Sequence, residues 1–122
     1  MNLLSDDLDE VDWEIMGANG THASSNYYGK GNTSQIFGEY HGIEAGEEGP
    51  QEGFHNYTLV WTEERLEWFL NGRVVRTVEA APAGEYPQTP SYVNLGLWAG
   101  GDPDNSEGTI AWAGGETEYD KG

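Results

Sequence analysis

Residues 9–15 read Asp-Glu-Val-Asp-Trp-Glu-Ile, and this stretch decides the fold class. Acidic and apolar side chains alternate along it with a period of two, which is typical of a β-strand with one face in a core. The acidic face is expected to hold Glu10, Asp12 and Glu14. The apolar face is expected to hold Val11, Trp13 and Ile15. Because three like charges on one face oppose folding, we interpret these carboxyls as placed for chemistry.

Aromatic and β-branched runs, separated by Gly, Asn and Pro, predict further strands along the chain. The expected strands cover residues 1–4, 8–15, 26–28, 37–43, 57–61, 65–70, 73–78, 92–98 and 109–112. Asn71-Gly72 predicts a two-residue type I′ turn between two of them. Loops are expected at 45–53 and 79–90. The pattern indicates an all-β protein.

The composition limits the classes of partner. The 122 residues include 22 acidic and five basic side chains, for a net charge of −17. This charge argues against nucleic acid and against an anionic membrane surface, whereas a neutral polysaccharide is not repelled. The length suits a single domain, and there is no cysteine, no signal peptide and no membrane-spanning stretch.

Three Asn-X-Ser/Thr triplets are candidate glycosylation sites. They begin at Asn19, Asn32 and Asn56. Such triplets are compatible with a secreted glycoprotein, but a chain rich in Asn and Thr also produces them by chance.

The spacing of the acidic strand permits glycosidase chemistry. On a regular strand the Cα atoms of Glu10 and Glu14 lie roughly 13 Å apart. If the side chains lean together, their carboxyls come within about 5–7 Å, close to the separation in retaining glycosidases. The charge of Asp12, between them, is expected to raise the pKa of a neighbour and so help to keep one Glu protonated. The alternative is an exposed acidic face without a function.

The acidic strand resembles the signature of glycoside hydrolase family 16, and the whole chain is similar to its fungal Crh-type chitin–glucan transglycosylases. The similarity rests on residues 9–14, 26–31, 54–58, 86–90, 97–103 and 108–115. The resemblance implies a concanavalin-like β-jelly-roll sandwich with a sugar-binding cleft. It also implies that Glu10 is the nucleophile, Glu14 the general acid and base, and Asp12 the residue that orients Glu10.

The resemblance implies an enzyme that acts on chitin or β-glucan by transglycosylation or hydrolysis, in the cell wall or outside the cell. Neither a cofactor nor a metal is implied, and residues 102–105 suit a turn better than a calcium loop. The expected substrate-binding residues are Trp98, Asn26, Tyr28, Lys30 and His55.

For several of these residues a structural role is the alternative. Trp98 is either a sugar platform or part of the core, and His55 and His41 either bind sugar or serve as structural histidines. Three other tryptophans are expected chiefly in the core: Trp61, Trp68 and Trp112.

Family members extend further at both ends, so we interpret residues 1–122 as one incomplete catalytic domain. An incomplete sandwich has an open sheet edge through which copies can associate. The alternatives to the enzyme are therefore a glycan-binding module without turnover and a self-associating remnant.

Overall fold

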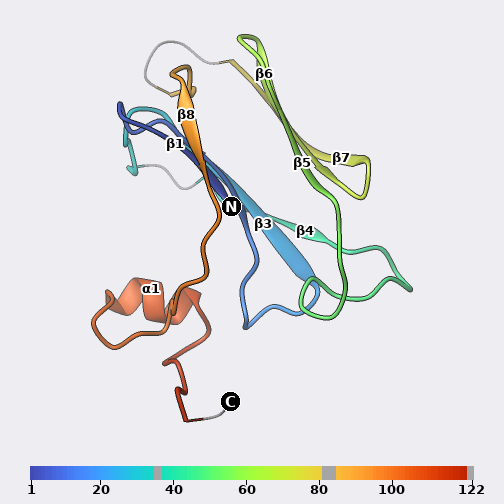
Figure 1. The fold of residues 1–122 in the computed structure, drawn as a ribbon, viewed down its shortest axis with the longest axis vertical. Coiled ribbons are helices and arrows are strands. Elements are labelled where there is room, and N and C mark those ends of the chain that lie inside the picture. Colours follow the sequence, from blue (N-terminus) through green and yellow to red (C-terminus); the bar gives the residue numbers. More distant parts are fainter. Residues whose placement is uncertain (35–36, 81–84, 121–122) are drawn as a thin grey trace.

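The computed structural model describes residues 1–34, 37–80 and 85–120, and strands make up most of its regular structure (Figure 1). Within these residues there are eight strands and one helix. In chain order they are β1 (Asn2–Ser5), β2 (Glu10–Glu14), β3 (His22–Tyr28), β4 (Glu39–Gly42), β5 (Tyr57–Trp61), β6 (Arg65–Leu70), β7 (Arg73–Glu79), β8 (Ser91–Asn94) and α1 (Glu107–Trp112).

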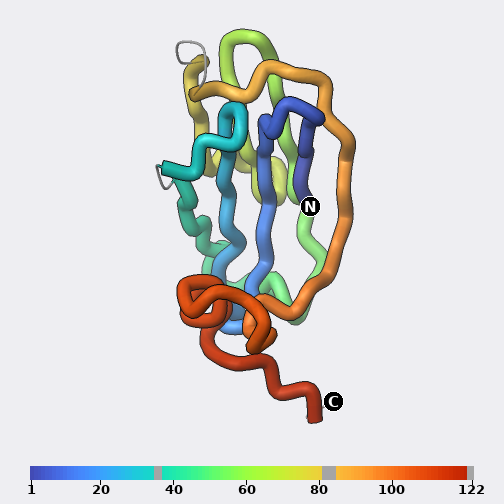
Figure 2. The backbone as a smooth tube through the Cα atoms, turned by 90° about the vertical axis from the view of Figure 1, so that its left-hand side faces the viewer, coloured from blue at the N-terminus to red at the C-terminus, as the bar shows by residue number. Residues whose placement is uncertain are grey.

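The strands form two antiparallel sheets that face each other. The larger sheet has the order β4-β3-β2-β1-β8, and the smaller has the order β5-β6-β7. Figures 1 and 2 show the two layers, with α1 and the C-terminal segment below one end. The predicted all-β sandwich is confirmed. The acidic strand β2 lies in the middle of the larger sheet, so strands hold it on both sides.

The core lies between the sheets and is built by alternation along the strands. On β2, Val11 and Trp13 are buried, and β6 contributes Leu66, Trp68 and Leu70. Trp68 Nε1 donates to the backbone carbonyl of Asp12 at 2.9 Å, so a core side chain is hydrogen-bonded directly to the backbone of the acidic strand. Buried indoles supply apolar area, and their N–H groups need a partner such as this one.

The middle of the chain follows the sequence prediction closely. Strands β6 and β7 are joined by Asn71 and Gly72, with φ angles of 51° and 78°. Positive φ at both positions is what a type I′ turn requires, and Asn and Gly tolerate it best. The predicted turn is confirmed.

Two predicted strands were wrong in whole or in part. Residues 109–112 lie in α1, because Ser106 caps the helix by accepting from the Thr109 N–H at 3.1 Å. The strand predicted to reach residue 98 ends at Asn94, which pairs with Asn2, the first residue of β1. No residue of β1 therefore lies opposite Leu95. Local β propensity gave no information about this missing partner.

Two smaller differences concern loops. Ile15 was predicted on the buried face, but β2 ends at Glu14 and Ile15 is exposed. The described parts of the predicted loop 79–90 are irregular after β7, and residues 81–84 lie outside the described part of the chain.

A buried carboxylate, that of Asp9, fixes the start of β2, and it was not among the predicted functional residues. Asp9 accepts hydrogen bonds from the backbone N–H groups of Lys30, Gln88 and Thr89 and from the Thr89 hydroxyl, at 2.7–2.9 Å. Burial alone raises the pKa of Asp9, but these hydrogen bonds outweigh it and hold that pKa below its ordinary value. Three segments far apart in the sequence are thereby tied together beside Glu10.

Candidate active site

The three acidic side chains of β2, Glu10, Asp12 and Glu14, project from the outer face of the larger sheet. We call them the acidic trio. Their position follows from alternation, since Val11 and Trp13 between them point into the core. The trio lines a cavity of about 280 Å³ together with residues that include Asn2, Asn94 and Trp98. Asp12 is almost fully buried, with 5% of its surface exposed, whereas Glu10 and Glu14 are half-buried.

Strand register brings two predicted substrate-binding residues to the trio. On β3, Asn26 pairs with Asp12 and Tyr28 pairs with Glu10, so these side chains share the outer face. Asn26 Nδ2 donates to the Tyr28 hydroxyl at 2.9 Å. From β1, Asn2 Nδ2 donates to Glu10 Oε1 at 3.0 Å. Asn2 was not predicted at this site, although pairing of the predicted strands 1–4 and 8–15 in this register places it opposite Asp12.

The electrostatics of the trio differ from the prediction. Burial, the charges of Glu10 and Glu14, and a hydrogen bond with Glu10 raise the pKa of Asp12 from 3.8 to about 8. Burial and then the charge of Glu10 raise the pKa of Glu14. The predicted rise in the pKa of one Glu thus holds for Glu14, but the charge of Asp12 is not among its causes. The larger effect falls on Asp12, the most buried of the three, whose raised pKa favours the protonated form that donates a hydrogen bond to Glu10.

The raised pKa of Asp12 predicts a stability that falls as pH rises. A carboxyl whose pKa is higher in the folded than in the unfolded chain makes its full contribution to the free energy of unfolding below the unfolded value, here 3.8. That contribution is lost as pH rises through the folded value of about 8. We expect Asp12→Asn to flatten the pH dependence of the unfolding free energy between these values. Urea titrations of both chains from pH 4 to pH 8 measure this. Equal slopes in the two chains would contradict the assignment.

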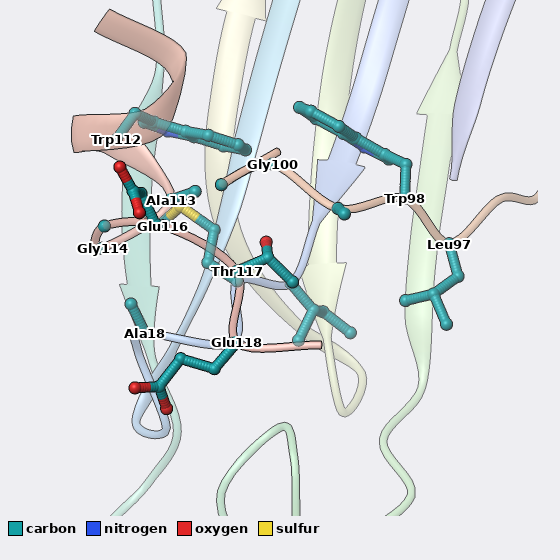
Figure 3. Close-up of a pocket in the computed structure, with 16 residues that line it drawn as sticks. Ala18, Leu97, Trp98, Gly100, Trp112, Ala113, Gly114, Glu116, Thr117 and Glu118 are labelled. Carbon is teal, nitrogen blue, oxygen red and sulfur yellow. The ribbon is translucent and has the colours of Figure 1, made fainter. Parts of the chain in front are cut away.

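Trp98 lines both the acidic cavity and a second, larger pocket. The larger pocket has a volume of about 840 Å³ and is shown in Figure 3. Trp112 was predicted in the core, but it lines this pocket and is 37% exposed. The reason is that it ends α1, a helix with no buried residue among those described.

The structure does not bring His55 to the trio. His55 lies just before β5, on the smaller sheet, where its Nδ1 contacts Asn71 Nδ2 at 3.0 Å and its ring packs against Tyr57. His41 lies in the interior, with its Nε2 2.7 Å from Ser25 Oγ. Both therefore have structural contacts.

Lys30 is held by its backbone and not by its side chain. Its N–H donates to Asp9 Oδ1, and the residue is exposed just beyond β3. Its contacts thus support the start of β2 and give its ammonium group no fixed place in the cavity.

No metal site emerges from the described residues, where no cluster of three or more His, Asp or Glu side chains is arranged to hold an ion. Residues 102–105 form the predicted turn, in which the Asp104 N–H donates to Asp102 Oδ1 at 2.9 Å and the Asn105 N–H to the Asp102 carbonyl at 3.0 Å. Over residues 1–34, 37–80 and 85–120, no helix has the length and apolar character needed to cross a membrane.

Comparison with known proteins gives close relatives. Crh-like protein 1 of Aspergillus fumigatus is 52% identical over 120 residues, which are 96% of this chain and 33% of that protein. Congo red hypersensitive protein 1 of Saccharomyces cerevisiae is 48% identical over 118 residues, which are 96% of this chain and 22% of that protein. The chain thus spans a third or less of these curated relatives.

A solved structure and a family model agree with these matches. A Crh5 transglycosylase in complex with NAG superposes with a TM-score of 0.91 at 49% identity, over 99% of this chain and 50% of that one. The model of the glycosyl hydrolases family 16 matches residues 1–114, which include the acidic trio, the strands of both sheets and α1. The chain belongs to glycosyl hydrolase family 16.

Proposed function

We propose that the chain carries the catalytic centre of a retaining enzyme that acts on β-linked cell-wall polysaccharide by transglycosylation or hydrolysis. The observation that carries the proposal is the acidic trio, with Glu10 and Glu14 on one strand face and the buried Asp12 between them. Two carboxyls on one face, one to act as nucleophile and one as acid, are what the chemistry of retaining glycosidases requires. The similarity to a transglycosylase in complex with NAG, the unit of chitin, supports the substrate class.

In the first step Glu10 is the nucleophile and Glu14 the acid. The Glu10 carboxylate attacks the anomeric carbon while the glycosidic C–O bond breaks, and the Glu14 proton passes to the leaving oxygen. The product is a glycosyl ester on Glu10. Burial and the charge of Glu10 raise the pKa of Glu14, which favours its protonated form.

In the second step Glu14 acts as the base. An acceptor hydroxyl gives its proton to Glu14, its oxygen attacks the anomeric carbon, and the bond to Glu10 breaks. If the acceptor is a sugar, the outcome is transfer, and if it is water, the outcome is hydrolysis. Two inversions at one carbon retain the β configuration.

Asp12 is a positioning residue in this scheme. As a protonated acid it donates a hydrogen bond to Glu10, and it adds no third charge to the face. Asn2 donates to the same carboxylate, so two donors fix the orientation of Glu10.

Three residues around the trio are proposed to bind the sugar: Asn26, Tyr28 and Trp98. Asn26 and Tyr28 lie beside the trio on β3, and Trp98 lines its cavity. A polymeric cell-wall substrate places the enzyme outside the cell or in the wall. The net charge of −17 does not repel a neutral polysaccharide.

A second candidate is a chain without turnover that binds glycan or associates with itself. It is favoured by apolar side chains exposed at β8 and just after it, namely Tyr92, Val93, Leu95 and Leu97. Exposed apolar groups along a sheet edge promote association between copies.

The test is transfer from chitin oligosaccharides to labelled β-glucan oligosaccharides. We expect labelled products that carry donor sugars, analysed by mass spectrometry, and their loss in Glu10→Gln and Glu14→Gln. Oligosaccharide binding without turnover, equal in all three chains, would contradict the enzyme and favour the second candidate. Size-exclusion chromatography of the same samples reports the association.

A further inference from the structure

The fold places the three Asn-X-Ser/Thr triplets in different surroundings. In each triplet the hydroxyl of the third residue donates to the asparagine Oδ1: Thr21 to Asn19 at 3.2 Å, Ser34 to Asn32 at 2.6 Å and Thr58 to Asn56 at 2.5 Å. An asparagine in such a triplet is the acceptor for an N-linked oligosaccharide in a secreted protein. Local geometry does not separate the three triplets, so the surface beside each one must distinguish them.

Asn19 has the most crowded surroundings of the three. It is half-buried in the turn after β2, and a Cβ on Gly49 would lie only 1.9 Å from the carbonyl oxygen of Gly20, the next residue in the triplet. Its other neighbour, Ala18, lines the larger pocket together with Trp98. A glycan on Asn19 would therefore crowd both the loop at Gly49 and the mouth of that pocket.

Asn32 lies in an exposed stretch just after β3. Residues 31–34 are all exposed, and the Asn32 N–H donates to the Gly29 carbonyl at 3.0 Å. A glycan on Asn32 would extend into solvent, because these neighbours offer no apolar surface for it to lie on. Asn32 is thus a matched reference for Asn56, with the same triplet chemistry in an open position.

Asn56 is exposed, and its backbone is fixed from both sides. Its N–H donates to Asn71 Oδ1 at 3.0 Å, and its carbonyl accepts from the Asn71 N–H at 2.9 Å. Within the described parts of the chain, no hydrogen bond engages Asn56 Nδ2, the atom to which a glycan is attached. The attachment point is therefore held in place while its acceptor atom stays available.

Asn56 lies at an apolar groove on the outer face of the smaller sheet, which we call the outer groove. It has a volume of about 540 Å³ and is lined by Asn56, Thr58, Val60, Phe69, Asn71 and Gly72. Phe69 on β6 pairs with Thr58 on β5 and with Val74 on β7, so this row crosses all three strands. Val60 is 36% exposed and Val74 is 49% exposed, which leaves apolar surface open to a ligand.

The outer groove and the acidic trio lie on opposite sides of the sandwich. Along β5, Tyr57, Leu59 and Trp61 pack against the core. Thr58 and Val60 alternate with them and therefore face outward. The trio projects from the outer face of the larger sheet, and the two sheets form separate layers (Figure 1). A group that fills the outer groove thus leaves the catalytic face open.

We propose that Asn56 carries an N-linked glycan whose first N-acetylglucosamine lies in the outer groove. The proposal rests on the part of the proposed function that puts the enzyme outside the cell. In the modification, Asn56 Nδ2 attacks the anomeric carbon of an oligosaccharide linked to a polyprenyl diphosphate. The N–C bond forms, the C–O bond to the diphosphate breaks, the amide gives up one proton and the lipid diphosphate leaves.

The groove suits a sugar tethered at its edge. A pyranose presents an apolar C–H face, which packs on Val60 and Phe69, and polar groups that pair with the Thr58 hydroxyl. Phe54 is fully exposed and lies two residues before Asn56, a distance of at most about 7 Å along the chain, so it supplies a second ring within reach. The covalent tether keeps the sugar at high local concentration, so a weak contact is populated. The glycan then covers apolar surface that would otherwise promote association.

The first experiment measures which asparagines are occupied. The chain is produced behind an added leader in the secretory pathway of a yeast, and total extract is treated with a peptide N-glycosidase in heavy-oxygen water. Each occupied asparagine becomes a labelled aspartate, which peptide mass spectrometry locates. We expect label at Asn56 and none at Asn19, and loss of one gel mobility shift in Asn56→Gln. Label at Asn19 in place of Asn56, or at neither, overturns the proposal.

The second experiment tests the outer groove. The Asn32→Gln chain is prepared from yeast, with its glycan at Asn56 only, and from bacteria, without a glycan. Because the two sequences are identical, the difference in Tm reports the glycan alone. We expect the glycan to raise Tm by about 3–5 °C, the scale of one favourable surface contact in a domain of this size.

Two matched comparisons show whether the groove carries this effect. Adding Phe69→Thr keeps a residue that favours strands but removes the ring, so the Tm difference should largely disappear. In Asn56→Gln, where only Asn32 can be occupied, the yeast and bacterial chains should agree within about 1 °C. An equal rise with and without Phe69→Thr, or no rise at all, overturns the placement of the sugar in the groove.

Neither experiment needs turnover, so the proposed function can fail without the glycan and the glycan without the proposed function. If the chain is active, the forms with and without the Asn56 glycan should agree within about twofold in transfer rate, because the groove lies away from the acidic trio. A larger loss in the glycosylated form would place the glycan at the catalytic face and contradict the proposal.

Discussion

Glu10→Gln is expected to lower both transfer and hydrolysis by at least about 10³-fold, the scale on which loss of a catalytic group usually acts. The amide cannot form the glycosyl ester, but it keeps the size of the side chain and can still accept from Asn2 Nδ2. Release of labelled sugar from a chitin oligosaccharide measures the loss. Folding should be unaffected, since the substitution removes one charge from a crowded acidic face.

Azide distinguishes the roles of the two glutamates. In Glu14→Ala, azide needs no base and attacks the glycosyl ester on Glu10, so a β-glycosyl azide is expected. In Glu10→Ala, azide takes the place of the nucleophile and attacks the substrate directly, so the expected product is an α-glycosyl azide. The anomeric configuration is measured by NMR. The reverse pairing would exchange the two assignments, and unchanged activity in Glu10→Gln would remove Glu10 from the chemistry.

Trp68→Ala is expected to cost about 4 kcal/mol of unfolding free energy, because the whole indole lies in the core and a cavity replaces it. None of its surface is exposed, and its N–H is bonded to the Asp12 carbonyl. A domain is usually stable by only about 5–15 kcal/mol, so much of the margin is lost. Urea denaturation followed by circular dichroism measures the change.

Trp112→Ala is the matched control for this prediction. It removes the same side chain from an exposed position, so we expect a loss of no more than about 1.5 kcal/mol. Equal losses in the two variants would contradict the division of the tryptophans into core and pocket residues. Loss of turnover in Trp68→Ala is also expected, since the backbone of Asp12 loses its support.

The central part of the fold was accessible from the sequence because its determinants are local. Alternation of apolar side chains predicted β2 and β6, aromatic and β-branched residues predicted β5, and Asn71-Gly72 predicted the turn from β6 into β7. In each case the period of two and the turn residues agree with the tertiary fold, so local and global preferences do not conflict.

Predictions failed where the local pattern competed with information from elsewhere in the chain. Thr109 and Ile110 favour a strand by propensity, but Ser106 supplies a helix cap, and none of the strands β1–β8 of the described residues pairs with them. Trp112 was predicted chiefly in the core, but it is 37% exposed. Neither its exposure nor its partner Trp98 can be inferred from spacing, since a loop and a helix bring them together.

By itself the sequence determined that three carboxyls share one strand face and that a hydrophobic face lies behind them, because the period of a strand is a local property. The burial and the pKa values of those carboxyls were decided by the tertiary structure. Burial of Asp12 between two charged neighbours, with Trp68 beneath its backbone, raises its pKa to about 8. The stacking of Trp98 on Trp112 likewise depends on tertiary contacts, with Gly100 packed against Ala113 and Gly114 against Ala18. Burial and long-range packing are properties of the folded chain, so no local pattern contains them.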